Sequence, residues 1–177
     1  MAGDKKNEDL LKASYDRYKA SVDGWQHIYT AALDDLRFVY DIDSGQWNEK
    51  IKNERNTDKR PVITVNKLLK FVRQLRGDMA INRPRTKVIP VDNKADVQMA
   101  KLYDGIIREI EYLSSANIAY DTAYMHAISC SVGFFRLLTE YENDTSFNQS
   151  IKIKRILNPF SVHFDPAASE FTLSDAK

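Results

Sequence analysis

The stretch FFRLLTEYENDTSFNQSIKIKRI, residues 134–156, decides the fold class of this 177-residue chain. Its two ends, FFRLLTEY and SIKIKRI, are rich in aromatic and β-branched residues, which favour strands. The middle part, ENDTSFNQ, is dense in residues that form turns. Isoleucine and lysine alternate in the second run, so one face of it is apolar and the other is wet. The stretch therefore predicts an antiparallel hairpin.

Upstream of the hairpin, apolar residues spaced alternately four and three positions apart run from Leu11 to Val39. This spacing predicts helix, and its length of about four heptads is typical of a coiled coil. Aromatic residues crowd the stripe, however, and Gly24 costs about 1 kcal/mol relative to alanine in a helix interior. We therefore expect two amphipathic helices, roughly 8–22 and 24–40, packed on a common body.

Three further helices are expected, at about 66–82, 96–114 and 117–130, the first of them with Asn66 as its N-cap. The residues expected to face inward on the first two are Val65, Leu68, Leu69, Val72, Leu75, Met79, Tyr103, Ile106, Ile107, Ile110 and Leu113. RTKVIPV, residues 85–91, is interpreted as a short edge strand. The predicted fold class is α+β, with several amphipathic helices followed by a small antiparallel sheet.

NPFSVHFDP, residues 158–166, is bracketed by two Asx-Pro dipeptides, which are turn signals. An extended segment there separates three apolar from three polar side chains: Phe160, Val162 and Phe164 against Ser161, His163 and Asp165. The polar trio has the residue types of a catalytic or metal site. Because His163 and Asp165 supply only two metal ligands, we interpret the trio as the outward face of the segment.

Charge is distributed unevenly along the chain, although the formal net charge is only +1. Residues 1–58 carry nine Lys or Arg against twelve Asp or Glu, a net charge of −3. Residues 59–87 carry nine against one, a net charge of +8, and residues 88–177 carry eight against twelve, a net charge of −4. Seven members of the basic segment are candidate contacts for nucleic acid or for another subunit: Lys67, Lys70, Arg73, Arg76, Arg83, Arg85 and Lys87. The interpretation favoured over these contacts is that the basic side chains form ion pairs with acidic side chains of the same chain.

Signals for catalysis or metal binding are weak. His27, His126 and His163 lie far apart in the sequence, and the six glycines form no phosphate loop. The pair Asp34–Asp35 is interpreted as a solvated helix face, and Asp41–Asp43 as turn residues, with a cation site as the alternative for the second pair. We therefore expect no enzymatic activity, no cofactor and no metal.

The cysteine content and the hydropathy of the chain indicate its redox compartment and whether a segment of it could span a membrane. Cys130 is the single cysteine, so it closes no disulfide within the chain, which fits a reducing cytoplasm. We expect it to be buried as a small hydrophobic residue. No run of about 18 apolar residues occurs, so no membrane-spanning segment is predicted.

Several collinear segments together resemble one family. They are DLRFVYDIDSGQW, KRPVITVNKLLKFVRQLRGDMAINRP, IPVD, SSANIAYDTAYMHAISCSVGFFRLLTEY and ILNPFSVHFDPAA. In these segments the chain is similar to the portal proteins of podovirus-like tailed bacteriophages, over most of residues 25–177. No single motif among them is catalytic.

The resemblance implies a structural role. Such portals form dodecameric rings at one capsid vertex, the head-to-tail connector through which double-stranded DNA is packaged and ejected. They dock the terminase large subunit during packaging and tail adaptor proteins afterwards, and they contact capsid proteins. The expected location is then the virion, and the host cytoplasm during assembly. Residues 158–166 would supply a strand of the wing region.

Family members are much longer than this sequence, which stops within what resembles the wing. We therefore expect a truncated product or fragment, with N-terminal helices and a polar loop in residues 1–58 and part of the wing in residues 59–177. The isolated chain is expected to be monomeric or poorly soluble. The alternative function, from another class of protein, is that of a free-standing nucleic-acid-binding protein that uses residues 59–87.

Overall fold

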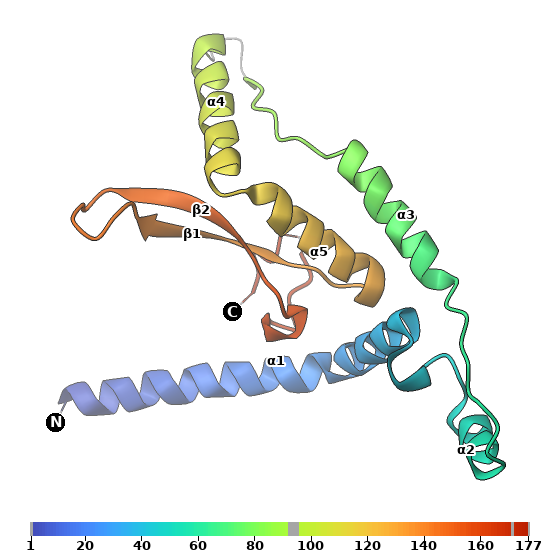
Figure 1. Cartoon of the computed structure of the whole chain (residues 1–177). Coiled ribbons are helices and arrows are strands. Elements are labelled where there is room, and N and C mark those ends of the chain that lie inside the picture. Colours follow the sequence, from blue (N-terminus) through green and yellow to red (C-terminus); the bar gives the residue numbers. More distant parts are fainter. Residues whose placement is uncertain (1, 92–95, 171, 177) are drawn as a thin grey trace.

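The computed structural model describes residues 2–91, 96–170 and 172–176, with side chains from Asn7 onward. The described elements are, in order, α1 (Ala2–Tyr40), η1 (Ile42–Ser44), α2 (Glu49–Thr57), α3 (Leu68–Ile81), α4 (Val97–Leu113), α5 (Ala116–Cys130), β1 (Phe135–Tyr141), β2 (Gln149–Arg155) and η2 (Pro159–Ser161). Helices precede a two-stranded antiparallel sheet, which confirms the predicted α+β class. The arrangement is open: α1 forms a rod along one side, while α4 and the hairpin extend in different directions (Figure 1).

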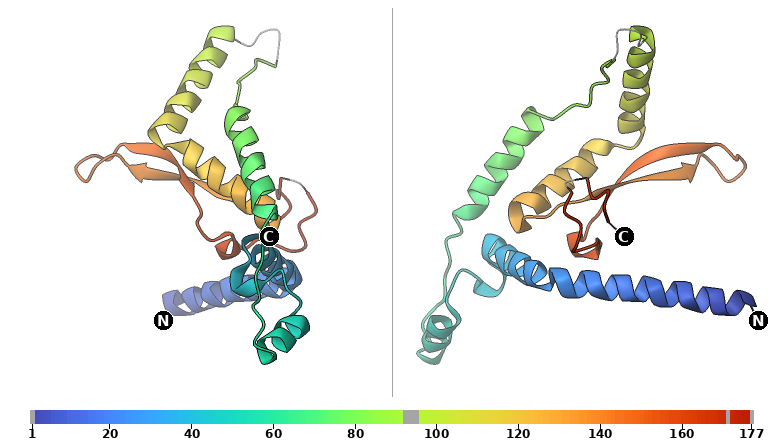
Figure 2. Two further views of the ribbon diagram at one scale, coloured as in Figure 1. Left: turned by 45° about the vertical axis from the view of Figure 1, so that its right-hand side comes forward. Right: turned by 180° about the vertical axis from the view of Figure 1, so that it is seen from behind.

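Helix α5 lies at the centre of the molecule, where it contacts α1, α3, α4 and both strands (Figures 1 and 2). Ala116, Ala119 and Ala123 are buried along it, and their small side chains let neighbouring elements approach the helix closely. Cys130 at its C-terminal end is fully buried, as predicted.

The predicted hairpin is confirmed. β1 and β2 pair antiparallel, from Phe135 opposite Arg155 to Tyr141 opposite Gln149. Ile153 is 6% exposed and packs against buried alanines of α5, so β2 joins the sheet to the central helix. Beyond this anchor the hairpin projects away from the helices (Figure 2).

The prediction of two N-terminal helices is wrong, because α1 is one continuous helix of 39 residues. Gly24 lies inside it without breaking it. A Cβ atom at position 24 would lie 2.6 Å from Cβ and 2.8 Å from Cγ of Pro166. The glycine therefore provides the room that Pro166 needs against the helix, which no local pattern in α1 indicates.

The aromatic stripe of α1 packs against residues 160–164. The ring centroids of Trp25 and Phe164 are 4.2 Å apart, and those of Tyr29 and Phe160 are 5.6 Å apart. The predicted fully extended segment is corrected at its start: one turn of 3₁₀ helix, η2, forms there, and the Asn158 side chain accepts a hydrogen bond from the backbone N–H of Phe160 at 3.0 Å. The stripe thus holds a segment more than 130 residues away in the sequence.

Ser21→Ala is expected to lower the free energy of unfolding by about 1–2 kcal/mol. Ser21 is 4% exposed, and its hydroxyl donates a hydrogen bond to the backbone carbonyl of Phe164 at 2.8 Å, so the variant leaves that carbonyl without this partner. Urea denaturation measures the change. Ser14→Ala is the matched control, because the Ser14 hydroxyl bonds only its own helix at an exposed site. Equal effects of the two substitutions would contradict the prediction.

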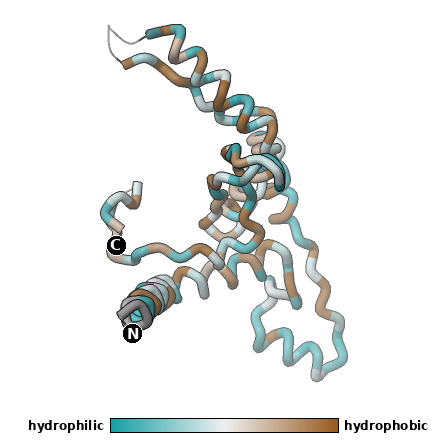
Figure 3. Tube along the Cα trace, turned by 90° about the vertical axis from the view of Figure 1, so that its left-hand side faces the viewer, coloured by the Kyte–Doolittle hydropathy of each residue, from teal (hydrophilic) through white to brown (hydrophobic). Residues whose placement is uncertain are grey.

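Two other predictions about α3, α4 and the segment between them are wrong. Residues 85–91 form no strand, since no other segment of the described chain pairs with them. Several residues expected to face inward are instead exposed: Val65 by 75%, Leu75 by 46%, Tyr103 by 53%, Ile106 by 41% and Leu113 by 59%. Hydrophobic residues recur along the whole of α4, beyond the part that meets other elements (Figure 3).

The accessible surface of the chain is 14272 Å². A compact monomer of 20.4 kDa exposes roughly 8,800 Å² by the usual scaling of surface with mass. The chain therefore exposes much more surface than a closed domain of its size, and large apolar side chains contribute to it.

Candidate nucleic-acid or subunit interface

The seven candidate basic residues lie at the N-cap of α3, on α3 and on the segment that follows it. We call them the basic face: Lys67, Lys70, Arg73, Arg76, Arg83, Arg85 and Lys87. All are exposed except Arg83, which is half-buried. The opposite side of α3 carries the buried Val72, and the helix contacts α5 and α1. Helical periodicity thus separates the charged side of α3 from its packed side.

Ion pairs within the chain leave most of this face unpaired. In the described ranges, Arg83 is the only member with an ion pair, to Asp121 at 3.8 Å. Pairing among the described residues therefore does not neutralise the basic face, contrary to the interpretation favoured from the sequence. The other six side chains are exposed to solvent in the described chain.

Exposed apolar side chains accompany the basic face. Phe71 is 59% exposed on α3, Ile63 before the helix is 71% exposed, and Ile81 at its end is 81% exposed. Nucleic-acid contacts need only positive charge near phosphates, whereas subunit interfaces combine apolar and aromatic residues with arginine. Exposed apolar side chains therefore lie beside the positive charges on α3 and next to it.

Two adjoining hollows lie between the end of α3, residues 82–86, the end of α4 and α5, with volumes of about 450 and 550 Å³. The first is mainly apolar and is lined by Met79, Tyr124 and Phe135 among others. The second is polar and is lined by Arg83, Arg108, Glu111 and Asp121 among others. Both include Arg85 and Tyr120. We call the two hollows together the α3–α5 cleft.

Tyr120 connects the two halves of the cleft. Its hydroxyl donates a hydrogen bond to Oε1 of Glu111 at 3.1 Å, and its ring lies edge-on to Phe135 at 5.1 Å. Burial, and then the neighbouring Glu111 carboxylate, raise the pKa of Tyr120 above its ordinary value. The tyrosine therefore stays protonated and acts as a fixed wall of the cleft rather than as a base.

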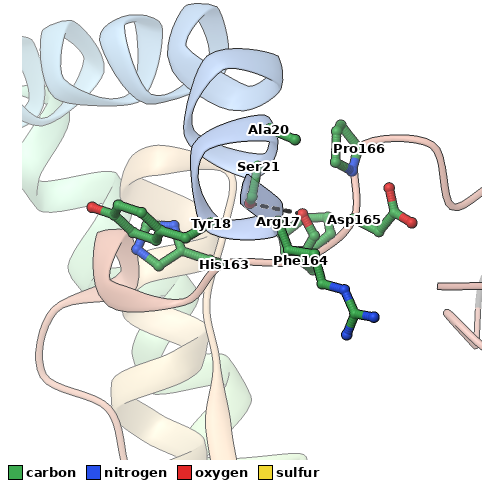
Figure 4. A pocket seen from close by; sticks show the side chains of 8 residues that line it. All are labelled: Arg17, Tyr18, Ala20, Ser21, His163, Phe164, Asp165 and Pro166. Atoms are coloured by element: carbon green, nitrogen blue, oxygen red, sulfur yellow. Dashed lines mark hydrogen bonds between the residues drawn. The ribbon is translucent and has the colours of Figure 1, made fainter. Parts of the chain in front are cut away.

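The polar trio of residues 158–166 does not converge on a reaction centre. Ser161 donates to the carbonyl of Asn158 at 2.7 Å, and Asp165 accepts from the backbone N–H of Ala167 at 2.9 Å. His163 lies edge-on to Tyr18 at 4.8 Å. A cavity of about 350 Å³ lies beside them, between α1 and residues 163–166, and Figure 4 shows the Ser21 hydrogen bond in its wall. Each polar side chain thus serves local structure or packing.

The other candidates for chemistry have structural surroundings. Burial lowers the pKa of His126 and raises the pKa of the Cys130 thiol, so both favour the neutral form. Asp41 accepts a hydrogen bond from the backbone N–H of Gln46 at 3.2 Å, which is the turn role expected of it. Within the described part of the chain, no three His, Cys, Asp or Glu side chains are grouped to hold a metal ion, and no helix has the length and apolar character to cross a membrane.

The sequence model of the Phage P22-like portal protein family matches residues 15–177 of this chain. The chain belongs to this family. A curated relative, the "Portal protein" of Acyrthosiphon pisum secondary endosymbiont phage 1, is 25% identical over 181 residues. That match covers 98% of this chain and 24% of the relative, so the portal-family chain spans about a quarter of the length of the relative.

Family membership confirms the resemblance drawn from the sequence. Portal proteins are structural rather than enzymatic, which agrees with the weak signals for catalysis in the sequence. Sequence reasoning identified the basic face but missed the α3–α5 cleft, because Met79, Tyr124 and Phe135 come from three different elements. It also passed over Phe147, the one large apolar residue of ENDTSFNQ, which is a signal the sequence does contain.

Proposed function

We propose that this chain forms part of a portal ring, the head-to-tail connector at one vertex of a phage capsid, through which double-stranded DNA is packaged and ejected. The observation that carries the proposal is the family match over residues 15–177. The open shape supports it, because an accessible surface of 14272 Å² leaves wide areas of α3 and α4 for neighbouring subunits. The function is one of shape and assembly.

The proposed partners follow from this role. Copies of the chain assemble into a homo-oligomer, a dodecameric ring in the full-length protein, which meets the terminase large subunit, a tail adaptor and capsid proteins. The ring resides in the virion, and in the host cytoplasm during assembly. The basic face contacts either a neighbouring subunit or DNA. Residues 1–58 and 59–177 are the two proposed parts, the second belonging to the wing region.

Immunogold labelling of virions whose tail vertex has been opened tests the proposal. An antibody raised against the 177-residue chain is expected to mark a single vertex, the one that carries the tail. An antibody against the major shell protein serves as the control, since it marks the whole capsid. Label over the whole shell, or virions without label after the vertex has been opened, would contradict a portal role.

A second candidate function is that of a free-standing nucleic-acid-binding protein. The observation that favours it is the basic face, on which six of the seven residues form no ion pair within the described chain. A regulator of this kind binds duplex DNA tightly and with a steep dependence on salt. A portal subunit on its own binds DNA only through weak phosphate contacts.

We expect weak, non-specific binding, with a dissociation constant of about 10⁻⁴–10⁻⁶ M at physiological salt. Lys70→Glu with Arg73→Glu should reduce the slope of log K against log salt by about 2, because two phosphate contacts are lost. Fluorescence anisotropy of a labelled duplex measures both quantities. Lys12→Glu with Lys19→Glu, on exposed positions of α1, is the matched control. Nanomolar binding by the original chain that is abolished by Lys70→Glu with Arg73→Glu would favour the regulator over the portal subunit.

A further inference from the structure

The turn of the hairpin presents one fully exposed aromatic side chain. Phe147 is 95% exposed at the end of the hairpin that projects from the body of the molecule (Figure 2). The turn is ordered by hydrogen bonds from Glu142 N–H to the Asn148 carbonyl at 3.0 Å and from Asn148 N–H to Ser146 Oγ at 3.0 Å. Covering this side chain with the apolar surface of a partner would be favourable, in proportion to the apolar area removed from water.

The α3–α5 cleft is a counterpart for such a side chain. Its apolar hollow of about 450 Å³ is lined by Met79, Tyr124 and Phe135, and aromatic rings pack favourably against each other. Charge matches at Arg85. Glu142 and Asp144 beside Phe147 are exposed and form no ion pair within the described residues, while Arg85 at the cleft is exposed and equally unpaired. The Glu111 carboxylate also lines this hollow, where it accepts the hydrogen bond of Tyr120.

The tip cannot reach the cleft of its own chain. Phe135 lines the cleft at the base of β1, and the strand runs outward from there to Tyr141. Seven residues of strand span about 20 Å at roughly 3.3 Å per residue, and the turn lies beyond them. The exposed apolar side chain and the apolar hollow lie on different parts of one subunit. When the first of one copy binds the second of the next copy, the contact is head-to-tail, which is the type of contact that closes into a ring.

We propose that Phe147 of one copy inserts into the α3–α5 cleft of the next copy, with Glu142 and Asp144 facing Arg85. The occupant of the cleft is thus a second copy of this chain, and Phe147 is the central anchor of the contact. The inference rests on the proposed ring, and it names the surfaces through which neighbouring subunits meet.

Photo-crosslinking of the purified 177-residue chain tests the contact even where it is weak. p-Benzoylphenylalanine replaces Phe147, and mass spectrometry locates the crosslinks in a mixture of ¹⁵N-labelled and unlabelled chains. We expect crosslinks between copies that map to residues 79–86 and 120–127. The same photoreactive residue at Tyr112, which is 84% exposed on α4, is the control for exposure alone.

Variants of the cleft and of the charges sharpen the test. Ala127→Trp, at an exposed residue of the cleft, should reduce the crosslinked dimer about tenfold by filling the apolar hollow. Glu142→Lys with Asp144→Lys should reduce it also, and adding Arg85→Glu should restore it. Circular dichroism verifies that each variant is folded.

Three outcomes overturn the inference: no crosslink between copies, crosslinks that map outside the cleft, or a dimer yield that Ala127→Trp leaves unchanged. If one of these outcomes is found and gold still labels the tail vertex, only the Phe147 contact is disproved and the portal role stands. If the crosslinks map to the cleft but the vertex carries no label, the portal role is disproved and the head-to-tail contact belongs to another assembly.

Discussion

Gly133→Ala is expected to lower the free energy of unfolding by about 3 kcal/mol, because an added Cβ would meet closer atoms there than at any other glycine whose surroundings the structure describes. Gly133 lies where the chain leaves α5 and turns back over it to begin β1. A Cβ atom there would overlap the carbonyl oxygen of Ala123, and it would lie 2.7 Å from the carbonyl carbon of Ala123 and 3.0 Å from the backbone nitrogen of Ala127. Because all three atoms belong to the helix backbone, no side chain can move aside to make room.

Urea denaturation followed by circular dichroism measures the loss. Gly105→Ala on α4 is the matched control, since a Cβ atom there meets nothing within 4 Å. Alanine favours helix over glycine by about 1 kcal/mol, so the control variant should be more stable than the original chain. A Gly133→Ala variant as stable as the Gly105→Ala variant would show that the segment leading into β1 does not approach α5 as closely as described.

Ile153→Ala is expected to cost about 3 kcal/mol. Ile153 is 6% exposed and packs with Ala116 and Ala119, so truncation leaves a cavity between β2 and the central helix. Few other large side chains are buried in the described chain, and neighbouring alanines are too small to fill the space. The hairpin should therefore loosen from α5 before the helices unfold.

Ile151→Ala provides a control on the same face of the same strand. Ile151 is 48% exposed, so its truncation should cost less than about 1 kcal/mol. Hydrogen exchange of the β1 and β2 amides shows whether the hairpin opens separately, because local opening raises exchange there first. Similar costs for the two isoleucines would indicate that the hairpin does not pack on α5 through Ile153.

The small core and the exposed apolar side chains have one explanation in the proposed ring. A subunit whose stability comes partly from its neighbours needs little core of its own, and it carries apolar surface where those neighbours pack. Val65, Leu75 and Tyr103, which the sequence predicts to face inward within the chain, are exposed and would then be positions where neighbouring subunits of the proposed ring pack.

Local patterns in the sequence were sufficient for much of the fold. Alternation in SIKIKRI and the turn residues before it predicted the hairpin, and apolar periodicity predicted α3, α4 and α5 to within about two residues. Asp96 caps α4 by accepting a hydrogen bond from the Gln98 N–H at 2.7 Å, a contact between residues two apart. Such features depend on near neighbours in the chain, and so does the charge of the basic segment.

Contacts between distant residues decided the rest. Gly24 signalled a helix end by its propensity, but Pro166, 142 positions later, needs its small size within one continuous helix. Whether Arg73 and Arg85 meet an acidic side chain, and whether Met79, Tyr124 and Phe135 enclose a hollow, depends on how α3, α5 and β1 pack. Composition and periodicity determined which segments are helix, strand or positively charged, and packing in three dimensions determined which of their surfaces are covered and which remain open to a partner.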